Sequence, residues 1–299
     1  MANLRDARLR IRAIQQTLQV TKAMKLISTA KLRKGRRILE DTVPYFSRLD
    51  KTMFDILSGA GMERSKFLST NSGINPERNS ASRTAIVVIT SDKGLAGGYN
   101  ANIFREVNQL CARVKNPVLI VIGAIGYRHF INSPWLILES YSYRSRLPDM
   151  EDAKEIAEYI ISQYLWDMFD EVHIIYTHMY SSIKQLPKEI QLLPLNEKKM
   201  QEKFEQSGGK RAELHFEYWP SKTEVFDHLV PIYIKGIIYC SLIEAYASEQ
   251  SARMSAMDDA SKNAEEMLAS LQIYYNHVRQ SSITQEMTEI VSGAATLNN

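Results

Sequence analysis

Apolar or small side chains recur at alternating intervals of three and four residues near the start of the chain. They are Leu4, Ala7, Ile11, Ile14, Leu18 and Thr21. This spacing lines one face of an α-helix and predicts a single long helix from Asn3 to Leu57, in spite of Pro44. Beyond Thr21 the same register falls on Lys25 and Ser28, so we expect something other than a matching apolar helix to face that stretch.

A second stripe with the same spacing lies toward the end of the chain. It consists of Met254, Met257, Ser261, Ala264, Leu268, Leu271, Tyr275 and Val278, and after a skip of five residues it resumes with Ile283, Met287, Ile290 and Ala294. The skip predicts a local change of winding. From Pro231 to Ala294 this helix would be on the order of 95 Å long. Two such helices most economically bury their stripes against each other, which predicts a long antiparallel coiled coil.

The middle of the chain has a different period. Thr84–Thr90, Pro117–Ala124 and Glu171–Tyr176 are short runs rich in β-branched residues, and helical stretches lie between them at Asn100–Val114 and Glu151–Phe169. Strand and helix therefore alternate. This order predicts an α/β fold, a Rossmann-like domain with a mostly parallel sheet and covering helices.

Segments rich in turn-forming residues set the expected domain limits. Ser58–Arg83 is rich in Gly, Ser and Asn, and Gly208-Gly209 marks the end of the middle domain. Lys184–Leu195 adds an edge strand, because its two prolines are tolerated only at edges or ends. We expect an N-terminal coiled-coil helix at 1–57, a connecting loop at 58–83, the α/β domain at 84–210 and a C-terminal coiled-coil helix at 211–299.

Positive charge is concentrated at the N-terminus, although the formal net charge of the whole chain is only +3. The basic residues are Arg5, Arg8, Arg10, Arg12, Lys22, Lys25, Lys31, Arg33, Lys34, Arg36 and Arg37. Such a helix would suit nucleic-acid phosphates, a solvated surface or a protein socket lined with acidic groups. No aromatic residue interleaves these charges before Tyr45, and the apolar stripe suits a helix partner, so nucleic acid is disfavoured.

Signals for disulfides, membrane spans and targeting are weak. Cys111 and Cys240 lie far apart, which indicates neither a disulfide framework nor a zinc site. The apolar run Pro231–Ala247 is interrupted by Lys235 and Glu244, so we expect no membrane span. The first residues lack the apolar core of a signal peptide, and we expect a protein peripheral to any membrane.

Signatures of catalysis are also weak. Ser91–Asn100 follows the first strand, as a nucleotide-binding loop would, but Gly94, Gly97 and Gly98 match neither G-x-G-x-x-G nor a G-K-[ST] loop. We expect a tight turn in which backbones approach closely. The six histidines lack metal-ligand spacing, and no nucleophile elbow occurs. No catalytic, cofactor-binding or metal-binding residue is therefore predicted.

The C-terminal segment Ser282–Ala295 combines an apolar stripe with small and polar residues. Small residues permit close approach of surrounding walls. The segment predicts either a tip inserted into a narrow sleeve or an end that frays into solvent.

Three segments together resemble the gamma subunit of F-type ATP synthases. They are Ile11–Arg37, with TKAMK and AKLR; Ser91–Asn100, with SDKGL and GGYN; and Ala247–Ala295, with ASEQSARMSAMDDASKNA and RQSSITQEMTEIVSGAA. Their order and spacing cover the whole chain. The resemblance implies a bacterial-type, non-catalytic subunit without a cofactor: the central rotor shaft of a proton-driven ATP synthase, which transmits rotation to the catalytic subunits.

The resemblance also implies partners and site residues. The partners are the hexamer of alpha and beta subunits, the epsilon subunit and the ring of membrane c subunits, at the cytoplasmic face of the bacterial plasma membrane. The family's pattern places Met24 and Lys25 against a moving beta lever, places Arg279 and Gln280 against a beta catch loop, and ties Arg253, Thr284, Glu286 and Glu289 to coupling. Trp219 departs from the acidic residue common in the family, near the epsilon and ring contacts.

Two other functions remain open at this point. A nucleotide-using α/β enzyme is supported by the glycine-bearing turn, and a basic coiled-coil scaffold for nucleic acid is supported by the N-terminal charge.

Overall fold

The computed structural model describes residues 4–58, 65–68, 83–143, 146–181, 184–196 and 217–297. The chain divides into two compact units, one of residues 1–29 with 253–299 and one of residues 30–252. Two helices contribute to both units: α1 (Leu4–Ser58) and α6 (Lys222–Leu297). Most of the expected 58–83 loop and the Gly208-Gly209 turn lie outside the described residues.

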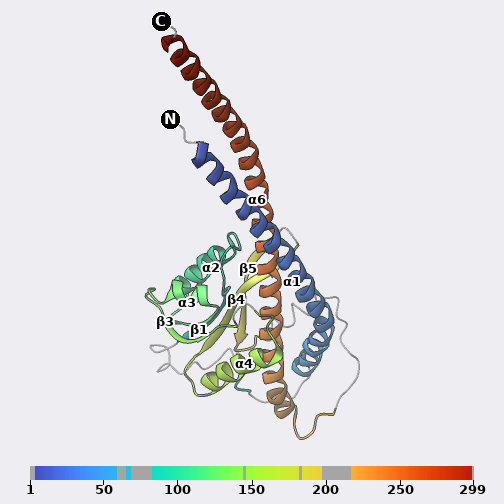
Figure 1. The fold of residues 1–299 in the computed structure, drawn as a ribbon. Helices are drawn as coiled ribbons and strands as arrows, with labels where there is room; N and C mark the ends of the chain where they lie inside the picture. The colour runs from blue at the N-terminus through green and yellow to red at the C-terminus, as the bar shows by residue number, and fades with distance from the viewer. Residues whose placement is uncertain are drawn as a thin grey trace. The chain divides into compact units, whose positions relative to one another are not determined.

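The larger unit contains a five-stranded sheet in the order β3-β2-β1-β4-β5 (Figure 1). The strands are β1 (Thr84–Ile89), β2 (Pro117–Ile122), β3 (Leu136–Tyr141), β4 (Glu171–Met179) and β5 (Gln185–Leu193). The first four run parallel, and β5 pairs antiparallel with β4 at one edge. The predicted α/β class, the mostly parallel sheet and the edge strand are confirmed.

Helices cover both faces of this sheet. The remaining helices are α2 (Tyr99–Arg113), α3 (Ala124–Phe130) and α4 (Met150–Leu165). Helices α2 and α3 pack on one face, while α4, α6 and the end of α1 pack on the other. All six residues of β1 are buried, because a strand covered on both sides needs apolar residues at every position.

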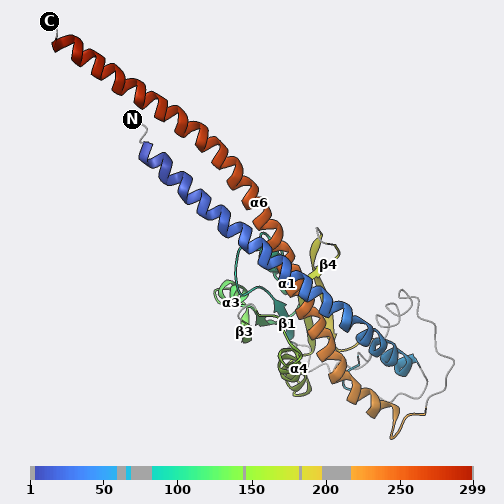
Figure 2. The same cartoon turned by 45° about the vertical axis from the view of Figure 1, so that its right-hand side comes forward.

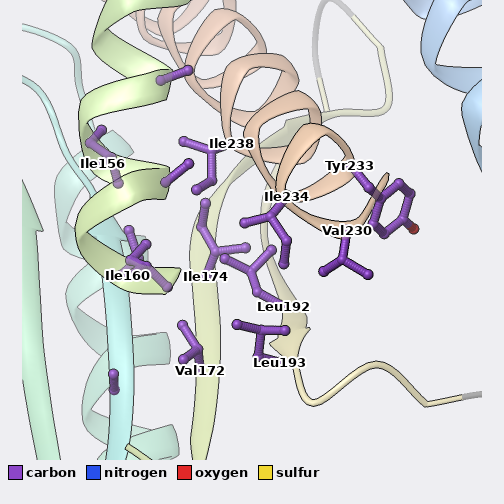
Figure 3. Close-up of a cluster of buried hydrophobic side chains, with 14 of the residues drawn as sticks. Ile156, Ile160, Val172, Ile174, Leu192, Leu193, Val230, Tyr233, Ile234 and Ile238 are labelled. Carbon is purple, nitrogen blue, oxygen red and sulfur yellow. The ribbon is translucent and has the colours of Figure 1, made fainter. Parts of the chain in front are cut away.

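The larger of the two apolar clusters joins helices α4 and α6 to the sheet (Figure 3). Ile156 and Ile160 come from α4, Ile174 comes from β4, and Ile234 and Ile238 come from α6; all five are fully buried. Each buried isoleucine of this kind stabilises the fold by roughly 1.5–3 kcal/mol relative to an exposed one. The cluster therefore fixes the first part of α6 on the sheet.

The smaller unit is a pair of antiparallel helices formed by the start of α1 and the end of α6 (Figure 2). The residues of the two predicted stripes, from Leu4 to Thr21 and from Met254 to Val278, are all buried or half-buried here. The predicted coiled coil is confirmed as far as Val278. Past the skip, the expected continuation is wrong, because Ile283, Met287 and Ile290 are exposed by 50%, 64% and 71%.

Two elements and two close contacts were not foreseen. Strand β3 and the short helix α3 had no prediction. The turn after β1 is tight, with Gly97 at φ 55°, but a Cβ at Gly94 would meet nothing within 4 Å. The close backbone approach occurs instead at Gly123 and Gly126, where a Cβ would lie 2.3 Å and 2.5 Å from oxygen atoms of Thr90.

Helix α6 is long and apolar enough to cross a membrane, by length and composition only, although the sequence predicted no membrane span. Its best 18-residue window has a mean hydropathy of 1.4, and 56% of that window is buried within the structure. A helix that packs its apolar side on a sheet has the same composition. The first part of α6, with Phe226, Val230 and Ile234, packs in the core of the larger unit in this way.

Candidate functional site: the paired terminal helices

Polar contacts fix the register of the two helices in the smaller unit. The hydroxyl of Ser261 lies 2.8 Å from that of Thr21 and 2.7 Å from the carbonyl oxygen of Met257. Thr21 in turn donates to the carbonyl oxygen of Leu18 at 3.0 Å. Every hydroxyl in this buried layer thus has a partner, so the layer specifies the register without leaving an unpaired polar group.

Charged side chains flank the buried layer. Lys22 lies 2.6 Å from Glu265, and Lys25 lies 2.5 Å from Asp258. Lys25, followed by Lys262, holds the pKa of Asp258 below its ordinary value through hydrogen bonds to the carboxylate. The side chains of both pairs are a third to a half exposed, so they set register more than they add stability.

The position of Lys25 bears on one expectation from the sequence. The loosening of the stripe at this residue predicted that something other than a matching apolar helix would face it. Lys25 reaches the carboxylate of Asp258 on the chain's own second helix, while Met24 beside it is half-buried. The exposed apolar residues of this stretch are Leu26 and Ile27, at 71% and 57%. The sequence signal for this exposed pair is that two adjacent apolar residues lie outside the stripe, and this signal was missed.

The other predicted contact residues lie on α6, and most of them are exposed. Arg253 is 7% exposed, whereas Arg279, Gln280, Thr284, Glu286 and Glu289 lie on the solvent-facing surface. Thr284 donates to the carbonyl oxygen of Gln280 at 2.9 Å, and Glu289 accepts from Gln285 at 3.1 Å. These contacts stay within one helix, so the exposed side chains remain available to another molecule.

The eight predicted residues do not converge on one point. Lys25 contacts Asp258, and Arg279 lies a further 21 residues along α6, which is roughly 30 Å of helix. A catalytic site needs its groups within hydrogen-bond reach of one another. The eight residues are therefore spread along a pair of helices and do not form one site.

The turn after β1 was the sequence's best support for a nucleotide-using enzyme. Asp92 in this turn accepts hydrogen bonds from the backbone N–H of Ala124 and from the hydroxyl of Ser142, both at 2.9 Å. Asn100 ties the turn to Ser91 from the other side at 2.7 Å. A carboxylate thus already occupies the start of α3, where it would repel a phosphate. The turn is a structural connection.

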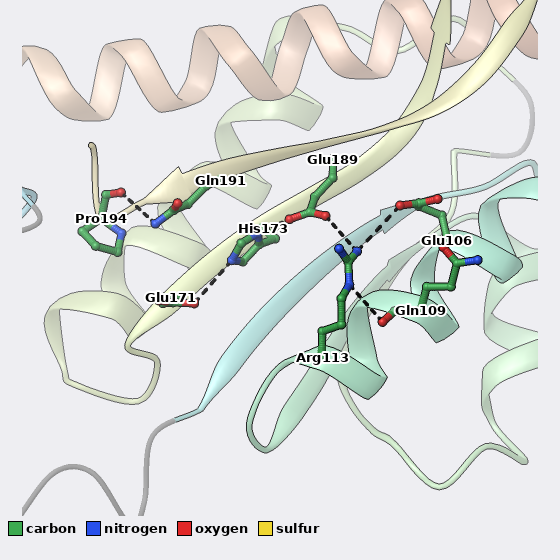
Figure 4. A network of polar contacts seen from close by, with 8 residues as sticks. All are labelled: Glu106, Gln109, Arg113, Glu171, His173, Glu189, Gln191 and Pro194. Carbon is green, nitrogen blue, oxygen red and sulfur yellow. Dashed lines mark hydrogen bonds and ion pairs between the residues drawn. The ribbon is translucent and has the colours of Figure 1, made fainter. Parts of the chain in front are cut away.

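A second polar cluster spans β4, β5 and α2 (Figure 4). His173 Nδ1 lies 2.9 Å from Glu189, which also lies 3.4 Å from Arg113. Arg113 additionally approaches Glu106 at 3.9 Å. No group of three or more His, Cys, Asp and Glu residues that would suit a metal ion occurs within the described residues. The cluster links the edge strand β5 to the helix layer.

Comparisons with known proteins agree with this geometry. The family described as ATP synthase matches residues 3–297. The chain is 41% identical to the ATP synthase gamma chain of Acetivibrio thermocellus over 99% of this chain and 100% of that one. It is 36% identical to the sodium-ion-specific ATP synthase gamma chain of Acetobacterium woodii, over 99% of both chains.

Solved structures show the same fold. A chain from the mitochondrial ATP synthase of Euglena gracilis aligns with a TM-score of 0.66 at 17% identity, over 98% of this chain and 94% of that one. A chain from the central stalk and c-ring structure of the Tetrahymena thermophila enzyme aligns with a TM-score of 0.59 at 25% identity, over 81% of this chain and 99% of that one.

Long terminal helices together with an α/β unit are the fold of the ATP synthase central-stalk chains. The chain belongs to the family of ATP synthase gamma chains. Its role is that of a non-catalytic central-stalk subunit.

Proposed function

We propose that this chain is the turning shaft of its ATP synthase and carries rotation from the membrane ring of c subunits to the catalytic beta subunits. The exposed end of α6 carries the proposal. Ile283, Met287, Ile290 and Val291 are exposed by 50–71%, although the stripe before them is covered by α1. A row of exposed apolar side chains on a helix marks a surface that another protein covers. Because the chain belongs to the ATP synthase gamma chains, we propose the hexamer of alpha and beta subunits as this partner.

The two helices of the smaller unit also differ in charge, as a shaft of this kind requires. The exposed side of α1 carries Arg5, Arg10 and Arg12, and the exposed side of α6 carries Asp259 and Glu266. A surrounding subunit changes state only if it meets different contacts in different orientations. Turning such a pair presents first a basic and then an acidic face to each beta subunit.

The predicted contact residues take distinct parts in this proposal. Met24 and Lys25 face the moving beta lever, with Lys25 held in place by Asp258. Arg279 and Gln280 meet the beta catch loop. Thr284, Glu286 and Glu289 contact the hexamer along the exposed end of α6, whereas the buried Arg253 acts through packing.

The remaining partners and the location follow from the same family. We assign the epsilon subunit and the c ring to the larger unit, where Trp219 is 89% exposed next to the start of α6. The complex would lie at the cytoplasmic face of the bacterial plasma membrane, with this chain peripheral to it. Proton flow would drive rotation in this complex. Because the Acetobacterium woodii relative is sodium-specific, ATP synthesis should be measured with a proton gradient and, for comparison, with a sodium gradient.

Reconstitution with alpha and beta subunits tests the shaft. Deleting Ile283–Asn299 should weaken ATP hydrolysis by the complex or uncouple it from ion pumping, because the apolar end loses its contacts. A triple variant, Ile283→Gln with Met287→Gln and Ile290→Gln, keeps the length of the helix and should show the same defect. Thr288→Ser on the same exposed segment is the control and should behave like the unaltered chain.

Three results would count against this proposal. Full coupled activity in both the deletion and the triple variant would exclude the proposed contact surface. Robust ATP hydrolysis by the pure chain, or heat on titration with ATP or NAD, would favour the nucleotide enzyme. Salt-dependent binding of DNA or RNA without affinity for the hexamer would favour the scaffold.

A further inference from the structure

A cavity of about 670 Å³ lies within the larger unit, between three of its elements. Val43 and Phe46 of α1 form one side, the strand β5 forms another, and Tyr233, Ile237 and Cys240 of α6 complete the wall. Its volume falls within the ~300–1,000 Å³ range of pockets that bind small molecules. The proposed shaft function does not involve this cavity.

A close contact between the two helices borders the cavity. The ring of Phe46 packs against the backbone of Gly236, where a Cβ atom would lie 1.9 Å from the ring. Phe46, Tyr176 and Tyr233 give the cavity rigid aromatic walls, and Tyr176 and Tyr233 are themselves buried. Such walls favour a flat aromatic molecule, which buries apolar area on both faces.

One polar group in the wall accepts no hydrogen bond. Ser241 is 2% exposed and lines the cavity, and its hydroxyl can donate to the oxygen of Tyr176, but no group among the described residues donates a hydrogen bond to Ser241 Oγ. The proton of the Tyr176 hydroxyl is directed to Glu244 and not to Ser241; burial, followed by the charge of Glu244 and this hydrogen bond, raises the pKa of Tyr176. A buried oxygen without a donor is unfavourable, and a ligand N–H or O–H would satisfy it.

The charges around the cavity balance. Asp50 and Lys188 line it with opposite signs. Glu189 also lines it, but its carboxylate is bound to His173 and Arg113 of the polar cluster described above. No excess of either charge is left to attract an ion, so the lining suits a neutral molecule.

We propose that this cavity is a binding site for a neutral, mainly aromatic small molecule whose single hydrogen-bond donor points at Ser241 Oγ. Such a ligand contacts α1, β5 and α6 together. It therefore binds only when these elements are packed as in the folded unit, and it stabilises that packing.

N-phenyl-1-naphthylamine is a suitable probe, because it is neutral and aromatic, carries one N–H donor, and fluoresces more strongly in apolar surroundings. Titrated into the full chain, it should give saturable binding at one site. Ser241→Ala should weaken this binding by about two- to tenfold, the effect of one lost hydrogen bond. Cys240→Phe should abolish it by filling the cavity. Binding that does not saturate would overturn the proposal.

Val225→Phe is the matched control, because Val225 is a half-buried α6 residue that does not line the cavity. The control should bind the probe like the unaltered chain. Circular dichroism establishes that all three variants keep the fold. If folded Cys240→Phe binds the probe as tightly as the control does, the site is elsewhere and the proposal fails.

Cys240 supplies a second readout in the unaltered chain. Burial raises the pKa of the Cys111 thiol to about 11, so Cys111 reacts slowly near neutral pH and Cys240 dominates alkylation. Saturating probe should slow the reaction of Cys240 with N-ethylmaleimide, measured by peptide mass spectrometry. An unchanged rate would contradict the proposal. Neither result bears on the shaft, which the reconstitution experiment tests separately.

Discussion

Gly236 is the residue at which α6 tolerates no side chain. A Cβ there would lie 1.9 Å from the Phe46 ring. Overpacking of this kind costs about 1–3 kcal/mol, so we expect Gly236→Ala to lower the free energy of unfolding by that amount, measured by urea denaturation. Shortening the opposing side chain with Phe46→Leu should recover part of the loss, because it removes the ring that clashes.

Gly94→Ala is the control for this prediction, since a Cβ at Gly94 meets nothing within 4 Å. Its free energy of unfolding should change by less than about 0.5 kcal/mol, as for an ordinary surface substitution. Equal effects of the two substitutions would show that the Phe46 contact is not what restricts α6.

Asp258 gives the paired helices a defined response to acid. Lys25 and then Lys262 hold the pKa of its carboxyl below the ordinary 3.8. A lowered pKa in the folded state contributes stability above pH 3.8, and this contribution is lost as the pH falls through the lowered value. The unaltered chain should therefore exceed Asp258→Asn in stability at neutral pH, and the difference should shrink below about pH 4.

Thermal unfolding followed by circular dichroism between pH 3 and pH 7 measures this difference. Asp259→Asn is the matched control, because it removes an adjacent carboxylate and leaves the contact between Lys25 and Asp258 in place. A stability difference that grows as the pH falls would contradict the assignment of Asp258 as a stabilising charge.

The same pair shows where prediction from sequence ends at the residue scale. The spacing of apolar residues placed Lys25 on the inner side of the coil correctly. Its partner depends on the antiparallel register, which the hydroxyls of Thr21 and Ser261 help to set across 240 positions of sequence. No local pattern encodes such a pairing, so the sequence predicted only that Lys25 would not face a matching apolar helix.

At the scale of elements, long periodic patterns were sufficient and short ones were not. The stripes gave both terminal helices, and the buried runs gave β1, β2 and β4. Strand β3 escaped because its apolar run is short and is followed by Glu139 and Ser140, and because its residues are half-buried or exposed at an edge of the sheet. Helix α3 escaped because seven residues make fewer than two full turns, too few for a period to show.

The α1 helix continues through Pro44, which local propensity alone would not favour. Proline lacks the N–H that would bond to the carbonyl of Glu40, and its ring crowds the preceding turn. Pro44 is exposed, so it can be replaced without disturbing the core. We expect Pro44→Ala to raise the free energy of unfolding by up to about 3 kcal/mol, measured by urea denaturation.

Asp41→Ala, an exposed substitution one turn earlier on the same helix, is the control for Pro44 and should have little effect. A loss of stability in Pro44→Ala would mean that the proline is required in α1. The packing of Met53, Ile56 and Leu57 into the core is the reason to expect the opposite, because it holds the end of α1 in place irrespective of Pro44.

At the scale of the whole molecule, the two units differ in how they exclude water. The larger unit has a sheet covered on both faces, whereas the described part of the smaller unit is two helices that share one stripe. Local opening of a structure costs less where few apolar contacts are buried. Amide hydrogen exchange in the isolated chain should therefore be slow in β1, β2 and β4 and much faster in residues 4–29 and 253–293.

Assembly with alpha and beta subunits should reverse this contrast along part of the chain. If the exposed apolar residues Ile283, Met287 and Ile290 are covered in the complex, exchange in residues 279–293 should slow by a large factor, while exchange in the buried strands should hardly change. Exchange measured by mass spectrometry on the free chain and on the complex gives both values. A helix enclosed by other subunits opens to solvent less often than a free one. Equal exchange rates of residues 279–293 in the free chain and in the complex would therefore contradict the proposed contact at the end of α6.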